Sequence, residues 1–177
     1  MSFDPNGFRD LAKLPSLRHL DMSSLHDTSN IMFASVASLT RLESLTLNFT
    51  LKLDDSRLLK ITEALLGLKM LDVSGCEKLS EESFRRIGSS LTSLQHVVLM
   101  HCDQVTVRML FHLEPLEHLT RLDVRHTEVG HMLSSSTDDN CSEDGKWLQR
   151  LDVLCCTRDQ CRVCDLKHSM LIPRYET

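Results

Sequence analysis

The stretch Leu68-Lys69-Met70-Leu71-Asp72-Val73-Ser74-Gly75-Cys76 decides the fold that we predict for this chain. Its apolar residues give the pattern L-x-x-L-x-V-x-x-C, and the same spacing of three apolar anchors occurs six times along the sequence. The first anchors are Leu17, Leu42, Leu68, Leu94, Leu119 and Leu148, at successive steps of 25, 26, 26, 25 and 29 residues. A period this regular is typical of a solenoid, in which each repeat stacks on the next.

Two further anchors complete each repeat. The second anchors are Leu20, Leu45, Leu71, Val97, Leu122 and Leu151. The third anchors are Met22, Leu47, Val73, Leu99, Val124 and Val153. Because side chains alternate between the faces of a strand, anchors two residues apart point the same way, into a core. Stacking predicts an α/β solenoid of about six repeats, a right-handed horseshoe arc with a parallel sheet on its concave face and helices on its convex face.

The segments between the predicted strands carry helix signals. Apolar residues at helical spacing, such as Leu58, Ile61 and Leu65, predict short helices on the convex side. Asp54 or Asp55 is a candidate N-cap for one of them. The segment 80–83, Ser-Glu-Glu-Ser, predicts the start of another helix, because acidic residues in a first turn interact favourably with the helix dipole.

The pattern divides the chain into three parts. Residues 1–16, which contain the apolar residues Phe8, Leu11 and Leu14, are expected to cap the first repeat. Residues 17–160 form the predicted solenoid, and the polar, acidic segment 133–146 is interpreted as a loop within it. Residues 161–177 are expected to form a C-terminal cap or tail.

Composition excludes several classes of protein. The 177 residues are 41% hydrophobic, enough for a core, and the net charge of −5 gives no general attraction to nucleic acid or to an anionic membrane. No apolar run is long enough to span a membrane, and the N-terminus does not resemble a signal peptide. Seven cysteines, an odd number, indicate reduced thiols in a cytoplasmic or nuclear setting.

The segment 73–80, Val-Ser-Gly-Cys-Glu-Lys-Leu-Ser, resembles the turn of leucine-rich-repeat proteins of the cysteine-containing class. The resemblance covers about residues 14 to 156. Such repeats are typical of the F-box and related substrate receptors of cullin-RING ubiquitin ligases, so the resemblance implies an arc that holds a substrate protein. The chain departs from those receptors because no F-box fits before Leu17, and docking on the usual adaptor is therefore not expected.

Three cysteines, Cys76, Cys102 and Cys156, lie three residues after a third anchor. At this position in such repeats a small polar side chain turns inward and bonds to the backbone of the next turn. Thr50 and Thr127 occupy it in two other repeats. We therefore interpret these cysteines as structural rather than reactive.

The phase of the anchors also identifies the residues on the exposed face of the sheet. The predicted binding residues of this face are Met70, Asp72, Ser74, His96, Val98, Met100, Arg121, Asp123, Arg125, Arg150 and Asp152. One interpretation is a protein-binding groove with an adaptable methionine-lined centre and charged ends that select the partner. The alternative is that the aspartates belong to the repeat itself and that neighbouring arginines and aspartates neutralise each other.

One cluster has the composition of a metal site. Cys156, Cys161, Cys164 and His168 include a C-x-x-C spacing and the four ligands of a tetrahedral zinc site. However, residues 161, 164 and 168 also fit one face of a helix that packs in a cap. A single C-x-x-C is a weak signal, and we predict no metal and no cofactor.

The predicted function is non-enzymatic, because the sequence contains no nucleotide-binding glycine loop and no nucleophile or zinc-protease motif. We expect a monomeric protein-interaction module that binds protein partners on its concave face. By resemblance it is an adaptor or substrate-recognition module of a cullin-RING ligase. The alternative is a scaffold subunit of a larger axonemal, ribosomal or mitochondrial complex.

The anchor assignment makes a direct prediction for stability. Leu71→Ala removes a central core side chain and leaves a cavity, so it should lower the free energy of unfolding by about 2–5 kcal/mol. Urea denaturation followed by circular dichroism measures this loss. A loss below about 1 kcal/mol would contradict the placement of Leu71 in the core.

Overall fold

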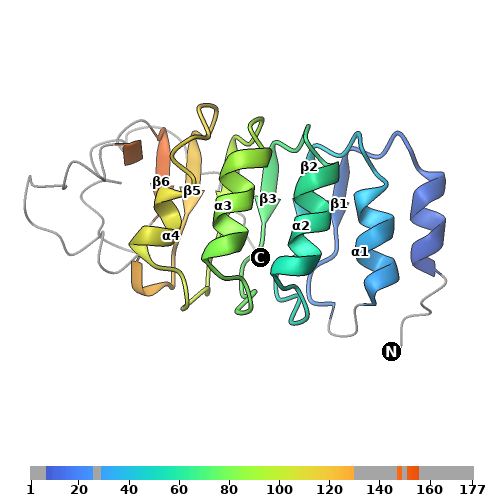
Figure 1. The fold of residues 1–177 in the computed structure, drawn as a ribbon, viewed down its shortest axis with the longest axis horizontal. Coiled ribbons are helices and arrows are strands. Elements are labelled where there is room, and N and C mark those ends of the chain that lie inside the picture. The colour runs from blue at the N-terminus through green and yellow to red at the C-terminus, as the bar shows by residue number, and fades with distance from the viewer. Residues whose placement is uncertain (1–6, 26–28, 130–146, 149–150, 156–177) are drawn as a thin grey trace, which may run out of the picture.

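A computed structural model describes residues 7–25, 29–129, 147–148 and 151–155 of the chain. Its strands form one parallel sheet in the order β1-β2-β3-β4-β5-β6 (Figure 1). The strands are β1 (His19–Asp21), β2 (Ser44–Thr46), β3 (Met70–Asp72), β4 (His96–Val98), β5 (Arg121–Asp123) and β6 (Val153–Cys155). Each strand lies beside the next one in the sequence, which is the topology of a solenoid.

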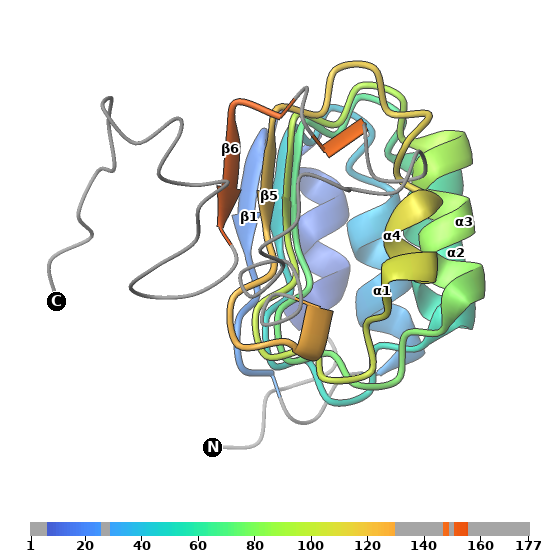
Figure 2. The same cartoon turned by 90° about the vertical axis from the view of Figure 1, so that its left-hand side faces the viewer.

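The helices lie on one side of this sheet. They are η1 (Gly7–Lys13), a 3-10 helix, followed by α1 (Asn30–Ala37), α2 (Asp55–Ala64), α3 (Glu81–Ser90) and α4 (Val107–Phe111). Figure 2, which looks along the stack, shows the sheet as one layer and the helices as the other. Because packed helices are spaced about twice as far apart as strands, the helix side is the convex side. The predicted α/β solenoid is confirmed.

The predicted anchors form the core. In repeats two to five, all three anchors of every repeat are at most 1% exposed. A further leucine, which the pattern did not include, lies three residues before each first anchor. These leucines are Leu39, Leu65, Leu91 and Leu116, and each is buried. Each one's carbonyl oxygen accepts a hydrogen bond from the first anchor's N–H at 2.9–3.0 Å, so the entry to every strand has the same geometry.

The register of the last repeat differs from the prediction by three residues. The Cα of Leu154, not that of Leu151, pairs with Leu122. The N–H of Leu151 donates to the carbonyl oxygen of Leu148 at 3.2 Å, as first anchors do in the other repeats. Leu151 is therefore the first anchor, and Leu148 is the leucine that precedes it. The prediction failed because leucines at 148, 151 and 154 satisfy the same spacing in two registers.

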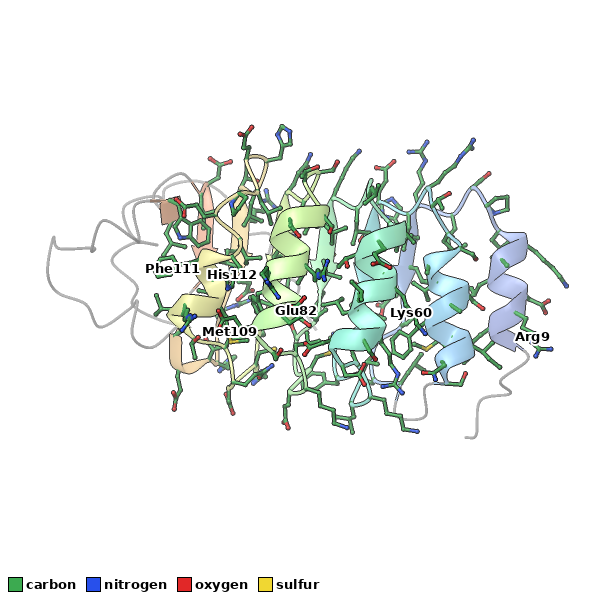
Figure 3. The ribbon with its side chains drawn as sticks, in the orientation of Figure 1. Arg9, Lys60, Glu82, Met109, Phe111 and His112 are labelled. Atoms are coloured by element: carbon green, nitrogen blue, oxygen red, sulfur yellow. The ribbon has the colours of Figure 1, made fainter. Side chains whose placement is uncertain are left out.

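Capping side chains begin the helices where polar residues predicted them. Asp54 accepts a hydrogen bond from the N–H of Arg57 at 3.0 Å and begins α2. Ser80 begins α3 and accepts from the N–H of Glu82 at 3.2 Å. Glu81 then contacts Nε2 of His112 at 2.9 Å, and Figure 3 shows His112 beside α4. The contact between Glu81 and His112 fixes α3 relative to α4.

The N-terminal segment follows its prediction only in part. Phe8 is buried, and Leu11 packs partly against the core, but Leu14 is half exposed. Figure 1 shows η1 beside α1, at the end of the stack where a cap is needed. The predicted loop 133–146 and the predicted C-terminal cap 161–177 lie outside the described residues.

The inward position of the turn cysteines is confirmed for Cys76 and Cys102. Cys76 and Cys102 are buried, and their thiols donate to the carbonyl oxygens of Leu47 and Val73 at 3.3 and 3.4 Å. These carbonyls belong to the preceding repeat, not to the next one as predicted. Burial raises the pKa of Cys76 to about 12 and that of Cys102 to about 11. Both thiols therefore stay protonated and act as hydrogen-bond donors.

Two glycines provide a test of the helix packing. A Cβ at Gly88 of α3 would lie 1.7 Å from the carbonyl oxygen of His112, whereas a Cβ at Gly67 would meet nothing within 4 Å. Gly88→Ala should therefore destabilise the protein by about 1–3 kcal/mol through overpacking. Gly67→Ala should change stability by less than about 1 kcal/mol. Thermal denaturation of both variants checks this, and equal stabilities would contradict the close approach of α3 and the segment at His112.

Candidate functional site on the open sheet face

The candidate site is the face of the sheet opposite the helices, here called the open sheet face. No described helix covers it (Figure 2). The register places Ser44, Met70, His96 and Arg121 side by side in one row across β2 to β5. A second row contains Thr46, Asp72, Val98 and Asp123. The predicted residues of repeats three to five are therefore brought together on adjacent strands.

The aspartates of this face have a structural role. Oδ1 of Asp21, Asp72 and Asp123 accepts a hydrogen bond from the backbone N–H two residues further on, at 2.9, 2.9 and 3.1 Å. An aspartate that bonds to its own backbone in this way stabilises the turn after the strand. This geometry supports the interpretation that the aspartates belong to the repeat itself.

The charges at the far end of the face partly neutralise each other. Nη2 of Arg125 lies 2.6 Å from Oδ2 of Asp123, and Nε of the same guanidinium also contacts this carboxylate. Asp123 is only 7% exposed. In contrast, Arg121 is exposed and forms no ion pair with any described residue. Arg121 is therefore the cation of this row that remains available to a partner.

The predicted apolar centre consists of two partly exposed methionines around a buried valine. Val98 is 8% exposed, whereas Met70 and Met100 are half-buried. Each sulfur accepts a hydrogen bond, that of Met70 from Ser44 Oγ at 3.4 Å and that of Met100 from Arg125 Nη2 at 3.6 Å. The methionines thus provide the contact area of the centre, and Val98 supports them from within the sheet.

Ser74 and His96 are less exposed to solvent than their predicted positions on this face suggest. Ser74 is buried, and its hydroxyl oxygen accepts from the N–H of Met100 at 3.2 Å, so it connects two turns. Burial lowers the pKa of His96, and the positive charge of Arg121 lowers it further against the opposing effects of Asp123 and Asp72. His96 is therefore neutral at neutral pH and offers an imidazole without charge.

One predicted binding residue, Asp152, does not take its predicted position on this face, and another lies outside the described residues. The three-residue change of register places Asp152 directly after the first anchor, where its N–H donates to the carbonyl oxygen of Thr120 at 2.8 Å. In the backbone register of the sixth strand, Val153 pairs with Arg121 and Cys155 pairs with Asp123 instead. Arg150 precedes the first anchor and lies outside the described residues, as do Cys156, Cys161, Cys164 and His168.

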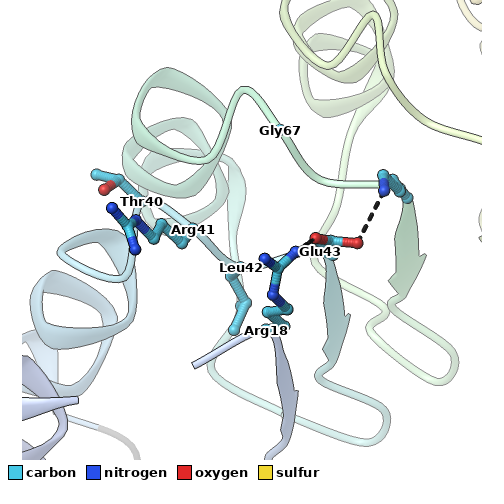
Figure 4. Close-up of a pocket in the computed structure, with 7 residues that line it drawn as sticks. Arg18, Thr40, Arg41, Leu42, Glu43 and Gly67 are labelled. Carbon is cyan, nitrogen blue, oxygen red and sulfur yellow. Dashed lines mark hydrogen bonds and ion pairs between the residues drawn. The ribbon is translucent and has the colours of Figure 1, made fainter. Parts of the chain in front are cut away.

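A shallow pocket, which no sequence pattern indicated, lies at the entry to the first three strands (Figure 4). It has a volume of about 310 Å³ and is lined by Arg18, Thr40, Arg41, Leu42, Glu43, Gly67 and Lys69. Glu43 pairs with Arg18 and, at 2.8 Å, with Lys69. The hydrogen bond from Lys69 lowers the pKa of Glu43, which remains a carboxylate between these two cations. The positive charges of Arg18 and Lys69 therefore neutralise the carboxylate of Glu43.

Among the described residues, no group of three or more histidine, cysteine, aspartate or glutamate side chains is placed to hold a metal ion. Within the same residues no helix is long and apolar enough to cross a membrane.

Comparison with known proteins establishes the fold class. No family model matches the sequence. The structure is similar to the tropomodulin C-terminal domain of Caenorhabditis elegans, with a TM-score of 0.58 and 17% identity over 84% of this chain and 93% of that one. It is also similar to TLR13 in the TLR13–ssRNA13 complex, with a TM-score of 0.56 and 22% identity over 81% of this chain and 19% of that one. Both are leucine-rich-repeat proteins, and this chain has the leucine-rich-repeat fold.

The environment of His96 predicts a pH dependence of stability. The folded protein keeps His96 neutral at pH values where the unfolded chain binds a proton, so stability should fall as the pH drops below about 6.5. His96→Gln should reduce this fall, and His118→Gln, which removes an exposed imidazole, is the control. Urea denaturation on either side of that pH measures the effect. Identical pH dependences for His96→Gln and the unsubstituted protein would contradict it.

Proposed function

We propose that this protein is a non-enzymatic protein-binding module whose partner lies across the open sheet face at β3 to β5. The observation that carries the proposal is the pair Met70 and Met100, partly exposed on neighbouring repeats, with the exposed Arg121 one strand further on. Methionine adapts its shape to an irregular partner surface. Arginine is enriched among the residues that contribute most to binding energy.

The charges of the face favour protein over nucleic acid as the partner. TLR13 is similar in fold and was solved with ssRNA13, but the present chain has a net charge of −5. Asp72 and Asp123 lie in the central row, and the guanidinium of Arg125 is directed to Asp123. A phosphate backbone needs several available cations. A partner with an apolar side chain over the methionines and a carboxylate toward Arg121 matches the face better.

The finer proposal concerns the process that this binding serves. The resemblance of residues 73–80 to cysteine-containing repeats supports a role as adaptor or substrate-recognition module of a cullin-RING ubiquitin ligase. The competing role, a scaffold subunit of a larger assembly, requires one fixed partner instead of exchangeable substrates. The two roles therefore predict different sets of co-purifying proteins.

Affinity purification with mass spectrometry tests the face and the role together. The test variant is Met70→Glu with Met100→Glu, which places two charges on the partly exposed centre and leaves the buried Val98 intact. The matched control is Ile31→Glu with Leu66→Glu, because these two exposed apolar residues lie outside the open sheet face. The test variant should lose its specific partners by at least about tenfold, and the control should keep them.

The outcomes separate the proposals. Equal recovery of partners by both variants, with thermal melting showing that both are folded, would exclude the open sheet face as the binding surface. Recovery of cullin and adaptor subunits would support the ligase role. A single stoichiometric assembly would instead support the scaffold.

A further inference from the structure

A second surface lies at the turns that follow the strands. In each of the first five repeats, the residue two positions after the third anchor has a positive φ between 52° and 65°. These residues are Ser24, Phe49, Gly75, His101 and His126. The solenoid thus requires a left-handed backbone at this point of every turn. Glycine adopts it without steric cost, whereas residues with a Cβ do not.

Ring side chains nevertheless occupy three of these five positions, and their rings are arranged in a line. The ring planes of His101 and His126 are stacked, with centroids 4.4 Å apart and an angle of 1° between the planes. The rings of Phe49 and His101 lie 6.0 Å apart although a whole repeat separates them. Phe49 reaches across that repeat because Gly75 has no side chain. A Cβ there would lie 2.4 Å from the ring. We call Phe49, His101 and His126 the ring strip.

The ring strip is accessible from solvent. His101 and His126 are exposed, and Phe49 is 42% exposed. Leu51, on the same turn as Phe49, is 49% exposed. Stacking covers the facing sides of His101 and His126, so the row presents ring edges and the outermost ring faces, with an apolar residue at one end. Such a surface is suited to contact with a flat or apolar group.

A row of carboxylates borders the ring strip. Glu77, Asp103 and Glu128 each lie four residues after a third anchor, two residues beyond the ring-strip position, and all three are exposed. The residue between the two rows is buried in each of these turns, so both rows face outward on either side of it. In repeats two and three the next residue along the chain is a lysine, Lys52 and Lys78, which offsets negative charge at that end of the row. The net negative charge is therefore concentrated beside His101 and His126.

We propose that the ring strip and its carboxylates bind an arginine-rich segment of a partner protein. A guanidinium group is planar, so it stacks on ring faces, and its edge donates hydrogen bonds to carboxylates. The outermost rings of the strip supply the faces, and Glu77, Asp103 and Glu128 supply the acceptors. Leu51 contacts an apolar residue of the same segment. The carboxylates repel phosphate, which excludes single-stranded RNA despite the stacked rings.

Fluorescence anisotropy with labelled peptides tests this site on the full chain. The probes are a peptide of alternating arginine and serine, its lysine counterpart, its glutamate counterpart and a single-stranded oligouridine. The first variant replaces Phe49, His101 and His126 with glycine, which suits the left-handed turn and therefore preserves the fold. The second variant replaces each of the carboxylates Glu77, Asp103 and Glu128 with glutamine. The matched control is Ile31→Glu with Leu66→Glu, which adds the same charge at two exposed apolar residues outside the ring strip and its carboxylates.

The expected result is specific for the guanidinium group and for this surface. The arginine peptide should bind at least about tenfold more tightly than the lysine peptide, and each triple variant should weaken it by at least about tenfold. The control should bind as the unsubstituted protein does. Equal affinities for the arginine and lysine peptides would overturn the proposal, as would preferential binding of oligouridine. Undiminished binding by the glycine variant, with its thermal melting temperature maintained, would also overturn it.

Discussion

One backbone carbonyl in each repeat determines the arrangement of the rest. The carbonyl oxygen of Arg18 accepts two N–H groups of the next repeat, at Glu43 and Ser44, and the carbonyls of Glu43, Lys69 and Gln95 do the same in turn. These hydrogen bonds of 2.7–3.0 Å fix the register of neighbouring strands. Because the register is the same in repeats one to five, residues at equivalent positions form straight rows across the molecule. The core leucines, the open sheet face and the ring strip are all such rows.

The fold could be predicted from the sequence because burial determines this register. Two leucines three residues apart indicate the strand register wherever the flanking residues are polar, as at Leu68 and Leu71. The same rule failed at the sixth repeat, where leucines at 148, 151 and 154 satisfy two registers equally well. The backbone hydrogen bonds distinguish these registers, and the three-anchor pattern alone does not. The leucine that precedes each first anchor, Leu65 for example, is the signal that would have resolved this ambiguity.

The candidate site was less predictable than the fold. Local hydrogen bonds to the backbone occupy polar side chains that the pattern alone places on an exposed face. The pattern placed Asp72, Ser74 and Asp123 on the open sheet face, but their side-chain oxygens bond to backbone N–H groups of the turns. The ring strip was missed for a different reason. Its members follow no apolar pattern, and the property that they share is a positive φ. Comparing the residues two positions after each third anchor would have revealed the row of rings.

The length of the helix differs between repeats, whereas the register of the strands stays the same. Helix α3 has 10 residues and α4 has 5, yet the strands β4 and β5 that follow them pair with the preceding strands in the same register. Length changes in the convex segment are therefore absorbed without displacing the rows of side chains. A repeat of this kind can gain or lose residues on its outer side during evolution, and a whole repeat can be duplicated, while the recognition surface is extended by one strand rather than rebuilt.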